Sequence, residues 1–249
     1  MPETTSPSAP TYAVCSVAIT ATDAAGAAAR IVRDALEGRV CEVHLCNAYT
    51  LSLVDQDAEL RAALAAGDLN LADGTPVAWF GRRHGMKGPV RGPGLVGEVV
   101  RLGGGDLRHY LYGGKEGVAD QMAAELGRLV PEARFVGTES PPFTPITDEH
   151  LTGLVERVRA SGATILWIGL GTPRQDYLVH RLAAELSMPV VPVGAAFDFW
   201  SGAVKEAPRR LQGSGLEWVY RLASEPRRLW RRYLFGNPRF LLSAWRHRG

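Results

Sequence analysis

Hydrophobic residues recur along the chain in short runs that alternate with amphipathic segments. The runs predict strands at residues 12–19, 40–46, 68–72, 109–112, 133–136, 164–168 and 189–193. Helical spacing between them predicts helices at residues 24–37, 51–66, 75–83 and 148–160, one that ends before Pro131 and one that follows Pro173. Asp23 and Thr147 are expected to cap helices, and Gly38 and Gly67 to end them.

Alternating strands and helices over residues 12–203 predict an α/β core, a Rossmann-like and mostly parallel sheet with helices on both faces. In such sheets, ligands bind beyond the carboxyl ends of the strands. Polar residues and glycines follow the predicted strands at that edge, namely Asn47, Asp73, Gly113, Gly169 and Gly194. Their clustering is the main indication of a site.

After Ala203 the alternation stops, and residues 204–249 are expected to form a basic, aromatic, helical appendage. From Lys205 onward, 11 Lys/Arg stand against 3 Asp/Glu, a net charge of +8, whereas the rest of the chain has 17 basic and 23 acidic residues, a net of −6. Such asymmetry indicates an anionic partner. Pro226 predicts a break between two helices.

The arginines of this appendage allow three interpretations. Arg221, Arg228 and Arg231 are seven and three residues apart, a spacing that would place them on one face of a continuous helix. They could clamp a lipid phosphate or a diphosphate, bind nucleic acid, or form a solvated basic face. The aromatic residues interleaved with them favour a bound surface.

Bulk composition excludes several classes of protein. With 249 residues, 46% of them hydrophobic and 22% charged, the chain is globular, and no apolar run is long enough for a transmembrane helix. Residues 1–11 read as a disordered tail rather than a secretory signal. Three cysteines without a CxxC pair indicate reduced thiols, a cytoplasmic location and no metal site.

The sharpest local motif is the run Gly169-Leu170-Gly171-Thr172-Pro173-Arg174-Gln175. Glycines after a strand let the backbone approach a diphosphate, and the next helix supplies free N–H groups. Many strand-to-helix turns need glycine for steric reasons alone, so both explanations stay open. The run is neither a dinucleotide fingerprint nor a P-loop.

Two further strand ends have a structural and a functional interpretation each. Asp73 could be a general base for an acceptor hydroxyl, but without context an N-cap of the helix at 75–83 is favoured. Asn47 could bind a sugar or nucleotide, or could serve the turn at a helix entry.

Taken together, several motifs in order resemble the WecG/TagA/CpsF family of glycosyltransferases from about Tyr12 to Leu242. The matching stretches are Asn47-Ala48, Leu71-Ala72-Asp73-Gly74, Leu111-Tyr112-Gly113-Gly114, residues 169–176, Val193-Gly194-Ala195-Ala196-Phe197-Asp198-Phe199 with Gly202, and residues 215–233. The resemblance implies an inverting transferase that needs neither a metal nor a cofactor. It would move N-acetylmannosamine or a related sugar from UDP to a polyprenyl-diphosphate-linked acceptor in cell-surface polysaccharide or teichoic acid assembly.

The resemblance also implies roles for particular residues. Asp73 matches the proposed base, and Arg221, Arg228 and Arg231 match arginines that stabilise the leaving diphosphate. Substrate-binding positions are expected at Asn47, Arg91, Gly113, Gly114, Gly169, Gly171, Pro173, Gln175 and Gly194. The appendage would contact the anionic inner face of the cell membrane, with no nucleic acid bound and a homo-oligomer possible.

The chain departs from the family pattern at several places. Leu45 replaces a threonine, Pro89-Val90-Arg91-Gly92-Pro93-Gly94 replaces Arg-x-x-Gly-x-Asp, Glu206 replaces an arginine and Asp176 a glutamate. These departures leave the donor sugar and the acceptor open. Two alternatives therefore stand beside the lipid-linked acceptor, namely a soluble secondary-metabolite acceptor and a non-catalytic module that binds nucleotide sugars or nucleic acid.

Overall fold

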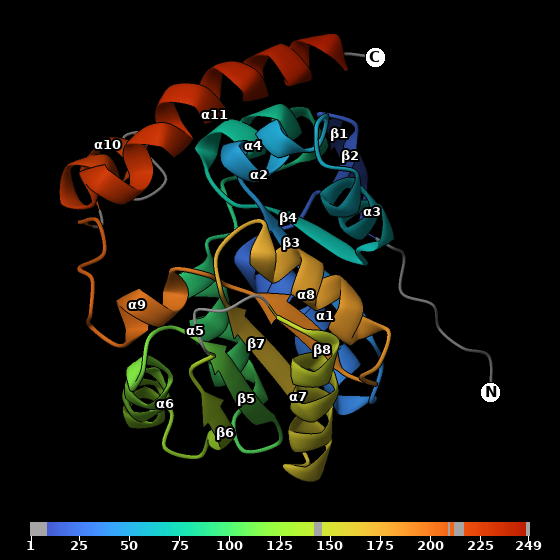
Figure 1. Ribbon diagram of the computed structural model, residues 1–249, viewed down its shortest axis with the longest axis vertical. Coiled ribbons are helices and arrows are strands. Elements are labelled where there is room, and N and C mark those ends of the chain that lie inside the picture. The colour runs from blue at the N-terminus through green and yellow to red at the C-terminus, as the bar shows by residue number, and fades with distance from the viewer. Residues whose placement is uncertain (1–8, 142–145, 209, 212–216, 248–249) are drawn as a thin grey trace.

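The computed structural model describes residues 9–141, 146–208, 210–211 and 217–247, which contain an eight-stranded sheet (Figure 1). The strands are β1 (Thr11–Val14), β2 (Val17–Thr20), β3 (Cys41–Cys46), β4 (Leu69–Ala72), β5 (Arg108–Gly113), β6 (Arg134–Glu139), β7 (Ile165–Gly169) and β8 (Pro189–Pro192). Their order is β1-β2-β4-β3-β8-β7-β5-β6, and only β1 and β2 pair antiparallel. The predicted fold class is confirmed.

Helices cover both faces of this sheet. They are α1 (Ala24–Leu36), α2 (Ala48–Leu53), α3 (Ala58–Ala66), α4 (Thr75–Phe80), α5 (Gly92–Gly103), α6 (Val118–Leu129), α7 (Asp148–Ala160), α8 (Arg174–Ala183), α9 (Ala196–Trp200), α10 (Glu217–Ser224) and α11 (Pro226–Arg246). Helices α1, α5, α6 and α9 bury apolar residues on one face, and α7 and α8 on the other. Each face thus has its own apolar core.

Two predicted elements are wrong in their extent. Residues 12–19 form a hairpin rather than one strand, because Cys15 and Ser16 turn the chain with φ of 51° and 64°. Residues 51–66 do not form one helix. Helix α2 already begins at Ala48, and Asp57 starts α3 by accepting a hydrogen bond from the Leu60 N–H at 2.9 Å.

Other expected boundaries are confirmed. Asp23 caps α1 and Thr147 caps α7 through their side-chain oxygens. Pro226 starts α11 directly after α10 ends, as predicted. Residues 1–8 of the expected tail lie outside the described residues, and Thr11 already belongs to β1.

The appendage packs onto the core through α11, which runs along α2 at the same end of the molecule as α4 (Figure 1). Phe240 and Ala244 of α11 are 3% and 6% exposed and join an apolar cluster with residues of β1, α2, α3 and α4. Gly236 lies against the ring of Tyr49, so that an added Cβ would be 3.0 Å from Tyr49 Cδ2. Close backbone approach thus seats α11 beside the strand ends.

Candidate active site

The carboxyl ends of five adjacent strands bring the predicted residues to one edge of the sheet. In sheet order, β4 leads into Asp73, β3 into Asn47, β8 into Gly194 and β7 into the turn that begins at Gly169, while β5 ends at Gly113. Strand β3 connects onward to β4 on one side, and β8 is reached from β7 on the other. A ligand crevice is expected where the connections diverge in this way.

Asp73 does not cap the helix that follows it, so the favoured structural interpretation is wrong. Gly74, with φ of 105°, is the N-cap of α4, and no side chain makes the capping hydrogen bond. The Asp73 backbone N–H donates to the Cys46 carbonyl at 2.9 Å, which fixes the carboxylate beside the end of β3. Its side chain is therefore available for chemistry.

The electrostatic surroundings of this carboxylate come from three segments. Burial raises the pKa of Asp73. Three groups oppose this increase, namely Arg221, Asn47 and Arg91, but the effect of burial is larger and the pKa stays raised. Glu217 adds to the increase. A carboxylate with a raised pKa binds a proton more readily, as a general base requires.

Asn47 has the structural role that the sequence allowed, at the entry of a helix. Its side-chain oxygen accepts a hydrogen bond from the Thr50 N–H at 3.0 Å and so caps α2. The same side chain also lowers the pKa of the Asp73 carboxyl. Substrate binding by Asn47 stays a prediction.

The Gly169–Gln175 turn is held together by its own polar groups. Gln175 accepts a hydrogen bond from the Gly171 N–H at 3.0 Å, and the peptide between Thr172 and Pro173 is cis. A Cβ at Gly194 would lie 3.2 Å from Gln175 Oε1, so the β7 and β8 ends meet at this carboxamide. The Gly171 N–H is therefore already occupied by Gln175.

Three of the glycines are explained by packing. A Cβ at Gly113 would lie 2.4 Å from Gly169 Cα, and one at Gly169 would lie 2.4 Å from the Phe197 ring. A Cβ at Gly114 would come within 2.6 Å of Val118. The steric explanation therefore accounts for these positions without a ligand.

Arg91, at the start of α5, reaches the appendage. Its guanidinium pairs with Glu206 at 2.6 Å and with Glu217 of α10 at 2.7 Å, and its side chain is 17% exposed. The pair with Glu217 ties α10 to the core, and Glu206 binds the same guanidinium from the segment before α10. Sequence reasoning singled out Glu206 only as a departure from the family pattern and did not identify Glu217.

The predicted arginines do not share one environment. Arg221 exerts the largest opposing charge effect on Asp73, and its guanidinium carbon lies 5.5 Å from the centre of the Phe199 ring. Arg231 is exposed and lies over the Trp230 ring at 5.2 Å. The side chain of Arg228 lies outside the described part of the structure.

Arg232 is a residue that the heptad-like spacing missed. Its guanidinium lies 4.9 Å from the centre of the Tyr49 ring and donates to the Thr172 carbonyl at 3.4 Å. It therefore touches the turn at the end of β7. The break at Pro226 places Arg221 on α10, apart from Arg231 and Arg232 on α11.

A groove between α2 and α11 opens beside Arg232. It encloses about 200 Å³ and is lined by Tyr49, Ser52, Leu53, Arg231, Arg232, Phe235, Gly236 and Arg239. Three guanidinium groups in a small hollow with an aromatic wall suit a phosphate that carries an apolar group.

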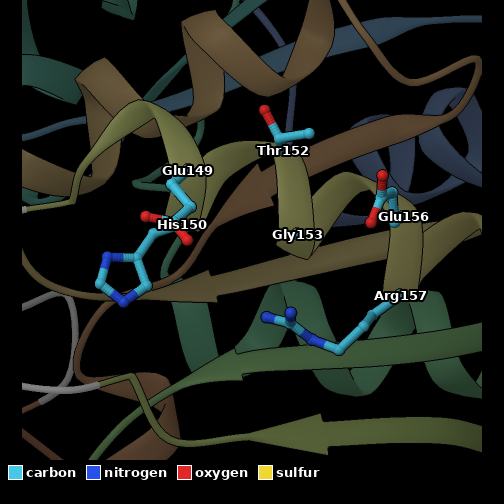
Figure 2. A pocket seen from close by; sticks show the side chains of 6 residues that line it. All are labelled: Glu149, His150, Thr152, Gly153, Glu156 and Arg157. Atoms are coloured by element: carbon cyan, nitrogen blue, oxygen red, sulfur yellow. The ribbon is translucent and has the colours of Figure 1, made fainter.

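A larger hollow of about 610 Å³ lies elsewhere, along α7 (Figure 2). All of its lining residues, Glu149, His150, Thr152, Gly153, Glu156 and Arg157, come from that one helix. Arg157 is already paired with Glu139 at 2.9 Å. None of the predicted site residues lines it.

Comparison with known protein families identifies a match that spans nearly the whole chain. A sequence model described as the glycosyl transferase WecG/TagA/CpsF family matches residues 12–249, nearly the whole chain. Within the described residues, no group of three or more His, Cys, Asp or Glu side chains is placed to hold a metal ion. No helix in that part of the chain is both long and apolar enough to cross a membrane.

Proposed function

The chain belongs to the WecG/TagA/CpsF family of glycosyl transferases, and from this premise we propose that it uses a UDP-sugar to glycosylate a polyprenyl-diphosphate-linked acceptor. The sugar is N-acetylmannosamine or a related hexose, and the product enters a cell-surface polysaccharide or teichoic acid. One observation carries the proposal. The Asp73 carboxylate caps no helix and lies where Asn47, Arg91 and Arg221 act on its pKa.

The proposed reaction is a single displacement with inversion. The acceptor hydroxyl oxygen attacks the anomeric carbon on the side opposite UDP, and its proton passes to the Asp73 carboxylate. The bond from the anomeric carbon to the diphosphate oxygen breaks, and UDP leaves with the electron pair. The raised pKa of Asp73 favours this proton transfer near neutral pH.

Negative charge grows on the diphosphate as that bond breaks, and the proposal assigns its compensation to arginine rather than to a metal ion. Among the positive charges that lower the pKa of Asp73, that of Arg221 has the largest effect. Arg232 donates a hydrogen bond to the Thr172 carbonyl. Arg91 contributes in another way. Its guanidinium pairs with Glu206 and with Glu217, and the second pair holds α10 against the core.

The acceptor side of the proposal is supported by α11. Trp230, Leu234, Leu241 and Trp245 are 42%, 60%, 64% and 66% exposed, and their spacing of four, seven and four residues puts them on one helix face. Arg231, which also lines the α2–α11 groove, lies over the Trp230 ring at the edge of this stripe. An apolar stripe with an adjacent arginine suits the surface of an anionic membrane, from which a lipid-linked acceptor would present its phosphates.

The test is UDP release from a panel of UDP-sugars with a polyprenyl-diphosphate-linked amino sugar or with soluble acceptors. We expect release only with the lipid-linked acceptor, together with co-sedimentation with vesicles that contain phosphatidylglycerol. Release with a soluble acceptor alone would move the protein to the modification of small molecules. No release with any donor, despite UDP binding, would leave a non-catalytic binding module.

A further inference from the structure

A buried chain of hydrogen bonds runs beneath the Gly169–Gln175 turn. The Thr172 hydroxyl donates to Asp176 Oδ2 at 3.1 Å, and Asp176 Oδ1 lies 3.1 Å from His44 Nδ1. His44 Nε2 lies 3.0 Å from Glu42 Oε1, which is also 3.0 Å from His180 Nδ1. The side chains of His44 and Asp176 are 0% exposed, that of Glu42 8% and that of His180 41%.

The geometry defines the protonation state of His44. Ionised carboxylates only accept hydrogen bonds, and a neutral imidazole carries a single N–H. With both carboxylates ionised, both contacts of the ring are satisfied only when it is an imidazolium. Burial opposes that charge, but hydrogen bonds and charges of Asp176 and Glu42 outweigh it and raise the pKa of His44 to about 8.

This imidazolium joins the two elements that carry the predicted donor site. His44 belongs to β3, which leads into Asn47, and Asp176 belongs to the first turn of α8, next to Gln175. Without the ring's charge, Glu42 and Asp176 would face each other across a buried space. The ring therefore fixes the start of α8 against β3.

We propose that His44, bridging Glu42 and Asp176, is a positioning residue that holds the Thr172–Gln175 turn in the conformation that binds the diphosphate of the donor. The proposal rests on the proposed function, because it takes this turn as part of the UDP site. His44 itself is buried beneath the turn and touches no substrate.

A pH dependence follows from this arrangement. The ionisable groups around the ring are Glu42 and Cys46 on β3, Asp176 and His180 on α8, and Asp68, which accepts from the Glu42 N–H ahead of β4. Because the folded pKa of His44 is raised, the bridge is complete below the ordinary histidine value and is lost as pH rises through about 8. Affinity for UDP should fall over the same range.

The experiment measures UDP binding by calorimetry and donor KM for wild type, Thr172→Val and His44→Gln between pH 6.5 and 9. Thr172→Val removes one hydroxyl and leaves the bridge in place, so it stays informative if His44→Gln does not fold. His150→Gln, an exposed position on α7, is the matched control. We expect both test variants to weaken UDP binding about tenfold at pH 7, with kcat at saturating donor nearly unchanged.

Nitrogen-15 NMR of the histidine rings gives a readout independent of UDP. At pH 7 both His44 ring nitrogens should be protonated, with titration near pH 8. A neutral His44 at pH 7, or variants that bind UDP as wild type does, would overturn the positioning role while leaving the transferase proposal intact. A wild type that binds no UDP would instead overturn the proposed function and, with it, the role of the turn.

Discussion

Replacing Asp73 by asparagine tests the proposed base most directly. The substitution keeps the size of the side chain and its place beside Asn47, but the amide cannot take the acceptor's proton. General bases contribute about 10²–10⁴-fold to turnover, which corresponds to about 3–5 kcal/mol of activation free energy. We therefore expect Asp73→Asn to lower kcat by that factor while UDP binding is retained.

The stability of the same variant distinguishes a catalytic carboxylate from a structural one. Burial raises the pKa of Asp73, so its ionised form costs folding free energy at neutral pH, and this cost shrinks as pH falls and the carboxyl is protonated. Asparagine carries no charge and makes no cap there. Asp73→Asn should thus unfold at the same temperature as wild type or a higher one, as is common when active-site groups are replaced.

The assay pairs steady-state UDP release with calorimetric unfolding. Asp106→Asn, an exposed position in the loop before β5, makes the same chemical change away from the site and serves as the control. In the wild type, kcat/KM should fall at acid pH with an apparent pKa above the usual range for aspartate, because the pKa of Asp73 is raised. A variant with turnover within about threefold of wild type, or one that unfolds well below it, would refute the assignment of Asp73 as base.

Further substitutions test the site and the core that supports it. Arg91→Met should lower kcat about ten- to hundredfold with little change in UDP affinity, because it releases Glu217 and with it α10, and UDP-release kinetics will measure this. Gly169→Ala should destabilise the fold by about 1–3 kcal/mol in urea unfolding, because its Cβ would meet Phe197, whereas Gly127→Ala, in open space on α6, should stabilise it by about 0.5–1 kcal/mol. Burial lowers the pKa of His109 to about 4, so stability should be complete above pH 6.5 and should fall by about 3 kcal/mol as pH drops from there to 4. His109→Gln should flatten this dependence in the same unfolding assay.

The sequence was most informative where periodicity and strand ends coincide. The parallel core, the N-cap at Asp23, the break at Pro226 and the placement of Asn47 and Asp73 at adjacent strand ends were all predictable from spacing alone. Each depends on contacts within a few residues or on the common direction of neighbouring strands. The family resemblance then supplied roles that spacing alone left open.

The rest depends on contacts between residues far apart in the chain. Cys15 and Ser16 adopt positive φ without a glycine or asparagine to signal a turn, so the hairpin was not apparent. Asp73 resembled a cap because the sequence does not reveal that Gly74 would occupy that position. The pair of Arg91 with Glu217 spans 126 residues and has no local signature.

The same long-range contacts divide the site between two parts of the chain. The carboxylate of Asp73 belongs to the core, but Arg221 and Glu217, two of the groups that set its pKa, lie on α10. Arg91 connects the two parts, since it pairs with Glu217 and itself lowers the pKa of Asp73. A displacement of α10 would therefore remove the largest opposing positive charge from the base and break the Arg91–Glu217 pair at once. The proton affinity of Asp73 is thus a property of the closed arrangement, in which the appendage completes the electrostatic surroundings that the core alone does not provide.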